Sequence, residues 1–138
     1  MLKRILLAVL GATGSFVAGL FGGWDTSIIT LLIFMLIDFV SGLIVAGIFH
    51  KSKKSESGAL ESRASWKGLI KKGMVLLMVV VANRLDLQLG TNYIRDAVCI
   101  AFMVNELISI IENSGLMGLP IPKVISNSIE LLKHQKEK

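Results

Sequence analysis

Four apolar stretches, each about as long as a membrane-crossing helix, constrain this chain more than any other feature. They cover residues 5–23, 27–49, 69–87 and 94–111. A helix needs about 20 mostly apolar residues to cross the hydrocarbon core of a bilayer. Only 18% of the 138 residues are charged and the mean hydropathy is +0.68, whereas about a quarter of a soluble domain is charged. The sequence therefore predicts an all-α integral membrane protein with four transmembrane helices, in one domain over residues 1–138.

The four stretches differ in how readily each would insert alone. The second is the most apolar, and on an insertion scale it accommodates one acid easily. The third carries Lys71, Lys72, Arg84 and Asp86 near its ends, and the fourth carries Glu106 inside it. For both stretches, the free energy of inserting into the membrane as an isolated helix is close to zero. We therefore expect them to insert against partner helices or to lie partly in the interface.

The first stretch has two interpretations. Lys3 and Arg4 before an apolar segment are also typical of a secretory signal peptide. However, small residues recur at every fourth position, which places them on one helical face that a second helix can approach closely. These residues are Gly11, Ser15, Gly19 and Gly23. Their spacing favours a retained helix with a packing face.

Basic residues are distributed unequally between the two sides of the predicted bundle. With four spans, 13 of the 15 lysines and arginines fall on one side, and the positive-inside rule then places both termini in the cytoplasm. The same side holds a predicted cytoplasmic loop, 50–68, and a predicted tail, 114–138. The basic loop comprises Lys51, Lys53, Lys54, Arg63, Lys67, Lys71 and Lys72. These charges flank membrane segments and hardly interleave with aromatic residues, so we expect no nucleic-acid partner.

Asp38 lies in the middle of the most apolar stretch, and Ser41 and Gly42 follow it closely. An ionisable residue inside a membrane faces another helix or water, because its exposure to lipid is unfavourable. Two interpretations stay open. The acid is either a functional group at a pore, or part of a helix-to-helix hydrogen bond that only aids assembly.

The fourth stretch carries a polar stripe. At 3.6 residues per turn, five polar side chains share one face about 120° wide. They are Asn105, Glu106, Ser109, Glu112 and Asn113. The opposite face is apolar, which predicts an amphipathic helix with one wet face. We expect the stripe to face water or a neighbouring subunit, and the alternative is a surface helix in the headgroup plane.

No pattern of catalytic or metal-binding residues accompanies these acids. His50 and His134 lie at a helix end and in the tail, and the one cysteine, Cys99, excludes a disulfide framework within one chain. We therefore expect no enzymatic activity, metal, cofactor or small-molecule substrate. Trp24 and Trp66 fall at predicted membrane boundaries, where tryptophan is common.

The segment after Pro120 predicts a short amphipathic C-terminal helix that leaves the membrane. Its apolar residues recur near helical spacing, at positions 121, 125, 129 and 132. Its end is basic, with Lys133, Lys136 and Lys138. Anionic lipid headgroups attract such a segment.

Three local sequence patterns occur across about residues 26–123. The most specific is NELISIIEN at 105–113, followed by GLPIP at 118–122. The others are DFVSG at 38–42 and the basic segment 62–72. Together they resemble the toxin-secretion and phage-lysis holin family. Ser41 and Arg63 depart from the family pattern, which often has threonine and lysine at those places.

The resemblance implies a homo-oligomer in the bacterial inner (plasma) membrane. Holins self-associate there and open lesions at a set time, through which a cell-wall-degrading endolysin, or in some relatives a toxin, leaves the cell. An antiholin is a possible partner. Two rival functions stay open: a small ion channel or transporter subunit that uses Asp38 and Glu106, and a non-pore scaffold or holin antagonist.

Overall fold

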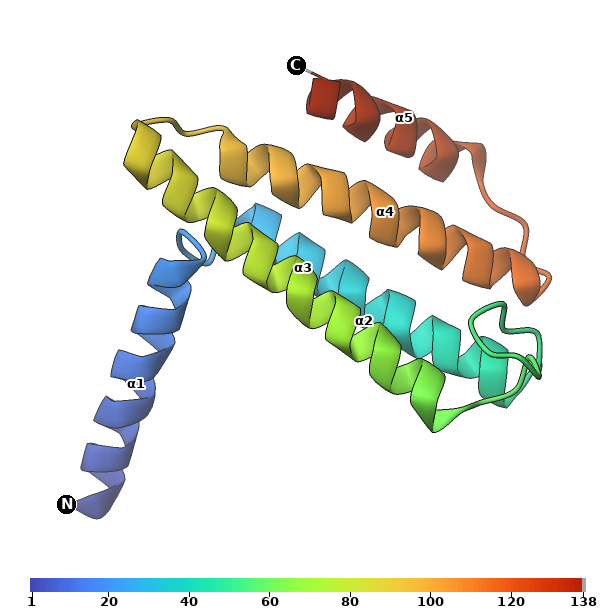
Figure 1. Ribbon diagram of the computed structural model, residues 1–138, viewed down its shortest axis with the longest axis horizontal. Coiled ribbons are helices and arrows are strands. Elements are labelled where there is room, and N and C mark those ends of the chain that lie inside the picture. The colour runs from blue at the N-terminus through green and yellow to red at the C-terminus, as the bar shows by residue number, and fades with distance from the viewer. Residues whose placement is uncertain (138) are drawn as a thin grey trace.

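A computed structural model describes residues 1–137 of the protein, with side chains up to residue 135. The described residues form five helices and no strand: α1 (Leu2–Leu20), α2 (Thr26–Gly47), α3 (Ser62–Leu89), α4 (Ile94–Leu116) and α5 (Lys123–Glu137) (Figure 1). The predicted all-α fold and the predicted C-terminal helix are confirmed. The side chains of Lys136 and Lys138, which belong to the predicted basic end, lie outside the described residues.

Helices α2, α3 and α4 form the body of the molecule. Helix α4 packs along both α2 and α3, whereas α2 and α3 make few direct contacts with each other. The core between these helices is made of small and medium apolar side chains: Ile28, Leu31, Met35, Val79, Cys99 and Met103. Cys99 is fully buried there, so it packs as a small hydrophobic residue.

Helix α1 stands apart from this body. It projects away from the bundle at an angle and contacts it, through α3, only near its own C-terminal end (Figure 1). None of its residues is buried. A Cβ built at Gly11 or Gly19 would meet no atom within 4 Å. The predicted small-residue face is therefore not covered by any helix of the same chain.

The first helix lies three residues nearer the N-terminus than the predicted stretch 5–23. It ends at Leu20, and Gly22 and Gly23 adopt positive φ values of 83° and 100° in the turn that follows. Glycine reaches this region without the steric penalty that a Cβ brings. Gly23 therefore does not belong to the helical packing face with Gly11, Ser15 and Gly19, and that part of the prediction is wrong.

The third helix begins earlier than predicted. It starts at Ser62, so the loop after α2 ends at Glu61 and not at residue 68. Arg63, Lys67, Lys71 and Lys72 consequently lie on the first three turns of α3, and their assignment to the loop is wrong. Lysine, alanine and leucine are good helix formers, so the helix extends through the charges that interrupt the apolar pattern.

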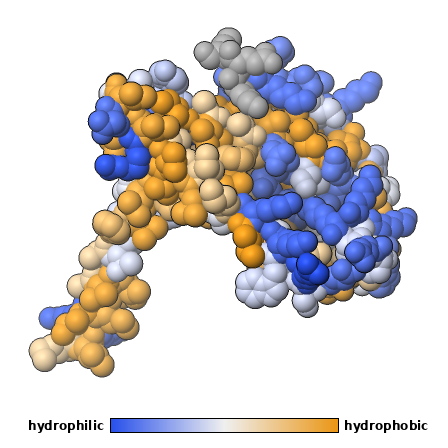
Figure 2. All heavy atoms as spheres, in the orientation of Figure 1, coloured by the Kyte–Doolittle hydropathy of each residue, from blue (hydrophilic) through white to orange (hydrophobic). Residues whose placement is uncertain are grey.

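Helix α5 turns back along α4 instead of leading away from it (Figure 1). Ile129 is buried at this contact, because an amphipathic helix buries its apolar stripe where another apolar face is available. Figure 2 shows hydrophobic side chains over α1 and the adjoining end of the bundle, and hydrophilic ones at the opposite end, around the α2–α3 loop.

Two helices, α1 and α2, are long and apolar enough to cross a membrane by length and composition. Helices α3 and α4 are long enough, with 28 and 23 residues, but they do not pass the same test of apolarity.

Candidate functional site

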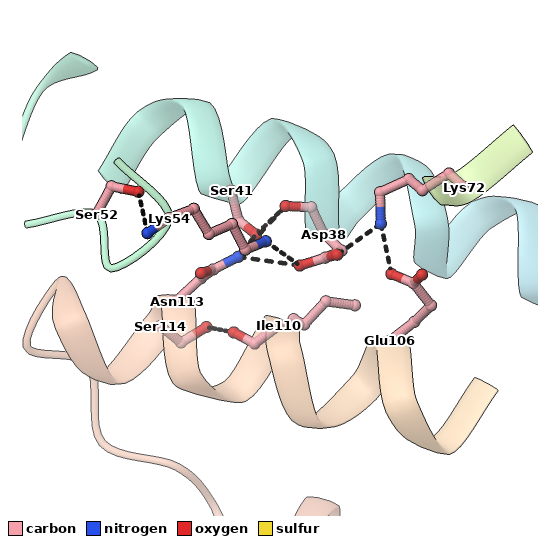
Figure 3. Close-up of polar contacts among 9 residues, drawn as sticks. All are labelled: Asp38, Ser41, Ser52, Lys54, Lys72, Glu106, Ile110, Asn113 and Ser114. Carbon is pink, nitrogen blue, oxygen red and sulfur yellow. Dashed lines mark hydrogen bonds and ion pairs between the residues drawn. The ribbon is translucent and has the colours of Figure 1, made fainter. Parts of the chain in front are cut away.

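Three charged side chains, one from each helix of the bundle, meet in its interior (Figure 3). The Lys72 ammonium of α3 lies 2.6 Å from Asp38 Oδ2 of α2 and 2.8 Å from Glu106 Oε2 of α4. Asp38 and Glu106 are 3% and 5% exposed. We name these three residues the charge cluster. It joins α2 to α4 through a lysine on α3.

Polar side chains complete the surroundings of Asp38. Asn113 Nδ2 of α4 donates hydrogen bonds to Asp38 Oδ1 at 3.1 Å and to Ser41 Oγ at 2.9 Å. The Ser41 hydroxyl in turn donates to the Asp38 carbonyl oxygen. The ammonium of Lys54, from the loop after α2, lies 3.9 Å from Asp38 Oδ1. Asp38 therefore interacts with two helices and one loop besides its own helix.

The charge cluster is largely compensated by its own lysine, and a loop lysine lies beside it. Its two carboxylates and one ammonium leave one negative charge, and Lys54 lies close enough to offset it. No described side chain has a buried polar atom without a hydrogen-bond partner. A buried charge without a partner is strongly unfavourable, so these polar residues can lie inside the bundle only because they lie together.

A cavity of about 510 Å³ leads from the charge cluster towards the α2–α3 loop. Polar and basic side chains line it, together with apolar ones such as Phe39 and Leu43. The charged lining residues are Asp38, Lys54, Glu61, Lys67, Lys71, Lys72 and Glu106. The cavity is large enough to admit water to the charge cluster.

The structure brings together most, though not all, of the site residues predicted from the sequence. Gly42, Asn105 and Ser109 line the cavity beside Asp38 and Glu106. Ser41 and Asn113 lie next to Asp38. Glu112 is exposed and takes no part in the charge cluster, so the predicted polar stripe of α4 divides between the interior and the surface.

The cation of the charge cluster was not assigned to the site from the sequence. Lys72 was expected in the basic loop, and the loop residues Lys51 and Lys53 do not line the cavity. The two acids in apolar stretches, Asp38 and Glu106, were the sequence feature that could have pointed to Lys72. Two buried carboxylates require a cation, and Lys72 is the lysine nearest the apolar centre of α3.

A second polar cluster holds the opposite end of the bundle. Arg95 of α4 donates to both carboxylate oxygens of Asp25, at 2.8 and 3.0 Å, and to the carbonyl oxygens of Phe21 and Gly23. The Arg95 guanidinium holds the pKa of Asp25 below its usual value. This stabilisation is therefore present at neutral pH and is lost only as the pH falls through the lowered pKa.

Two residues of α3 extend the second polar cluster. Asp86 accepts hydrogen bonds from the backbone N–H groups of Ile94 and Arg95, and so caps the first turn of α4. Asn83 donates to the carbonyl oxygens of Gly19 and Leu20, which end α1. The sequence predicted only that Asp86 lies near a helix end, and not that it caps α4 or that the Arg95 side chain binds the turn between α1 and α2.

Residues 15–134 match the bacteriophage holin family. A probable holin of Bacillus phage phi105 is 30% identical over 108 residues, which cover 78% of this chain and 74% of that protein. An uncharacterised protein of Listeria monocytogenes is 39% identical over 117 residues, covering 84% of this chain and 78% of that protein.

A third relative, described as an uncharacterised 14.9 kDa protein in the nagH 3' region of Clostridium perfringens, is 34% identical over 125 residues, 89% of each chain. No solved structure matches the sequence. The family match includes α2, α3 and α4 completely, and so contains the whole charge cluster. The chain belongs to the bacteriophage holin family.

Proposed function

We propose that this protein is a holin that assembles into oligomers in the bacterial cytoplasmic membrane and opens lesions that release an endolysin. The observation that carries this proposal, beyond family membership, is the buried charge cluster between α2, α3 and α4. Polar side chains that form hydrogen bonds and ion pairs inside one bundle can form equivalent interactions with water or with a second copy of the protein. Such groups allow one sequence to be stable both as a sealed bundle and as the wall of a lesion.

In this proposal α1 to α4 all cross the membrane. Helices of 19 to 28 residues are long enough, at 1.5 Å per residue, for a hydrocarbon core of about 30 Å. Several residues that lower the hydropathy of α3 and α4 are buried and paired within the bundle. These are Asn83, Asp86, Arg95, Glu106 and Asn113. Paired and buried polar groups are compatible with a transmembrane helix.

The positive-inside rule then places both termini and the α2–α3 loop in the cytoplasm. Helix α5 carries Glu130 and Lys133 on its exposed surface, and these cannot stay against hydrocarbon. In this arrangement α5 would separate from the position along α4 that it has in the structure, and would lie on the cytoplasmic headgroups with its apolar stripe facing the lipid. The function is a change of assembly state and not a chemical reaction.

The test is to induce the protein in bacteria and to measure the membrane potential and the release of a cytoplasmic muralytic enzyme. We expect both a loss of potential and release of the enzyme. Glu106→Leu should abolish both at matched protein level, because α4 loses the charged group on its wet face. Glu106→Gln keeps a hydrogen-bonding group and should retain part of the activity. Wild-type timing for Glu106→Leu would contradict the proposed role of this face.

A channel or transporter subunit is the second candidate, because two acids share one lysine beside a cavity that water can enter. Proton or ion transfer would need the charge itself, so Glu106→Gln would be as inactive as Glu106→Leu. An ion-selective conductance of fixed size would favour this candidate. A protein that delays lysis by another holin without permeabilising the membrane would be an antagonist.

A further inference from the structure

The cavity beside the charge cluster has two lysines that the cluster does not use. Lys67 and Lys71 lie one turn apart on α3, line the cavity and are exposed. Among the described side chains neither has an ion-pair partner, whereas Lys54 and Lys72 both face Asp38. The rim of the cavity therefore offers two positive charges that have no ion-pair partner among the described residues, at the end of the bundle that carries the α2–α3 loop.

An apolar groove adjoins this rim. It has a volume of about 400 Å³ and is lined mainly by Phe39, Leu43, Leu60, Trp66 and Leu69. The first three of these residues also line the cavity, so the groove and the cavity are neighbours between α2 and α3. These are the two bundle helices that pack least against each other. The opening between them consequently presents cationic and apolar surfaces together.

We propose that this opening binds one anionic phospholipid of the cytoplasmic leaflet. The headgroup phosphate would lie against the ammonium groups of Lys67 and Lys71, and an acyl chain would lie in the groove beside Trp66 and Leu69. Basic pockets between helices on the cytoplasmic side suit anionic headgroups, and tryptophan favours the membrane interface. A soluble phosphate would satisfy the lysines but would leave the apolar groove unfilled.

The inference rests on the proposed function in one respect, namely that α3 enters the membrane from the cytoplasmic side. It adds a specific ligand to that function. Lipid binding can be measured on the purified full chain without any lysis. A protein that lyses cells but shows no lipid preference would overturn the lipid site and leave the holin function intact. A protein that prefers the anionic lipid but does not lyse cells would overturn the holin function and leave the lipid site intact.

The experiment is native mass spectrometry of the full chain in a neutral detergent, titrated with dioleoylphosphatidylglycerol or dioleoylphosphatidylcholine. We expect one phosphatidylglycerol per chain to bind in preference to phosphatidylcholine. The double variant K67Q/K71Q should lose this preference, with an affinity for phosphatidylglycerol at least roughly tenfold lower, equivalent to about 1.4 kcal/mol. The matched control K51Q/K53Q removes the same charge from loop lysines outside the cavity and should bind like wild type.

Two further measurements distinguish the contribution of the headgroup to lipid binding from that of the acyl chain. Trp66→Ala should weaken the binding of both phospholipids alike, because it alters the groove and not the cationic rim. Glycerol 3-phosphate, a soluble phosphate ester, should not displace the bound lipid. Equal losses in K67Q/K71Q and K51Q/K53Q, equal affinity of the wild type for both lipids, or displacement by glycerol 3-phosphate would each overturn the proposed lipid site.

Discussion

At the scale of single residues, Lys72 decides whether the bundle can hold two acids. Its ammonium lies within 2.8 Å of both Asp38 and Glu106, and both carboxylates are almost completely buried. Removal of one member of a buried ionic group leaves the others without compensation, which is far more destabilising than loss of a surface ion pair. The lysine is therefore the residue whose loss the bundle can tolerate least.

We predict that Lys72→Met lowers the free energy of unfolding by about 3–5 kcal/mol. The measurement is thermal or denaturant unfolding of the purified protein in detergent, followed by circular dichroism. The adjacent Lys71→Met serves as the control, because Lys71 is exposed and has no ion-pair partner among the described residues. Addition of Glu106→Gln to Lys72→Met should recover part of the loss. Equal stability of the two single variants would show that the charge cluster does not stabilise the fold.

Asn113 is the second residue on which Asp38 depends. Its side-chain amide donates to the Asp38 carboxylate and to Ser41, and it is buried. We predict that Asn113→Ala destabilises the protein by about 1–3 kcal/mol, because a buried acceptor loses its donor. Glu112→Ala, at the exposed neighbouring position, should change stability by less than about 0.5 kcal/mol. The same unfolding measurement compares the two, and an equal change in both variants would contradict this role.

At the scale of elements, the turn after α1 determines how the first helix joins the bundle. Gly22 has a φ of +83°, and a Cβ at this position would lie 2.6 Å from Asn83 Oδ1 and 2.8 Å from Arg95 Nε. Both of these side chains are buried and hydrogen-bonded in the second polar cluster. Neither can move aside without the loss of its own partners.

We predict that Gly22→Ala destabilises the protein by about 1–3 kcal/mol through backbone strain and this close contact. Gly14→Ala is the matched control, because Gly14 lies within α1 with open space around it. There, alanine should be neutral or stabilising by up to about 1 kcal/mol. Thermal unfolding in detergent distinguishes the two variants. A Gly22→Ala protein as stable as wild type would mean that the turn is not under this constraint.

The exposed face of α1 bears on assembly and not on the fold of one chain. Gly11 and Gly19 meet no neighbour within the described chain, so bulk added there should leave the stability of the isolated bundle unchanged. We predict that Gly11→Leu and Gly19→Leu nevertheless reduce chemical crosslinking between copies in the membrane, because small residues allow close helix approach. Thr13→Leu, on the opposite face of α1, is the control. Unchanged crosslinking in both glycine variants would show that this face does not mediate assembly.

At the scale of the whole molecule, the charge distribution defines an orientation. Thirteen of the 15 lysines and arginines fall at the side of the molecule assigned to the cytoplasm in the four-span arrangement. We predict that a cysteine introduced at the exposed Ser57, in a Cys99→Ala background, resists a membrane-impermeant thiol reagent in intact cells before lysis begins. It should react promptly once the cells are opened. Rapid labelling in intact cells would reverse the orientation.

Much of this protein follows from local sequence patterns. Apolar segments of membrane length predicted an all-α fold, and helical spacing predicted the C-terminal helix that the structure contains as α5. The polar positions of α2 and α4 were also evident, because an acid in an apolar segment needs no tertiary information to be recognised. Four complete spans stay a prediction.

Only the tertiary structure decided which groups meet. Lys72 is separated by 34 residues from Asp38 and by 34 from Glu106, and hydropathy patterns carry no information at that range. The same holds for Arg95, which reaches Asp25 across 70 residues. Periodicity reports the local exposure of one helix, whereas ion pairing depends on how three helices pack. The sequence thus determined where charges lie along each helix, and packing determined that they compensate one another inside the bundle.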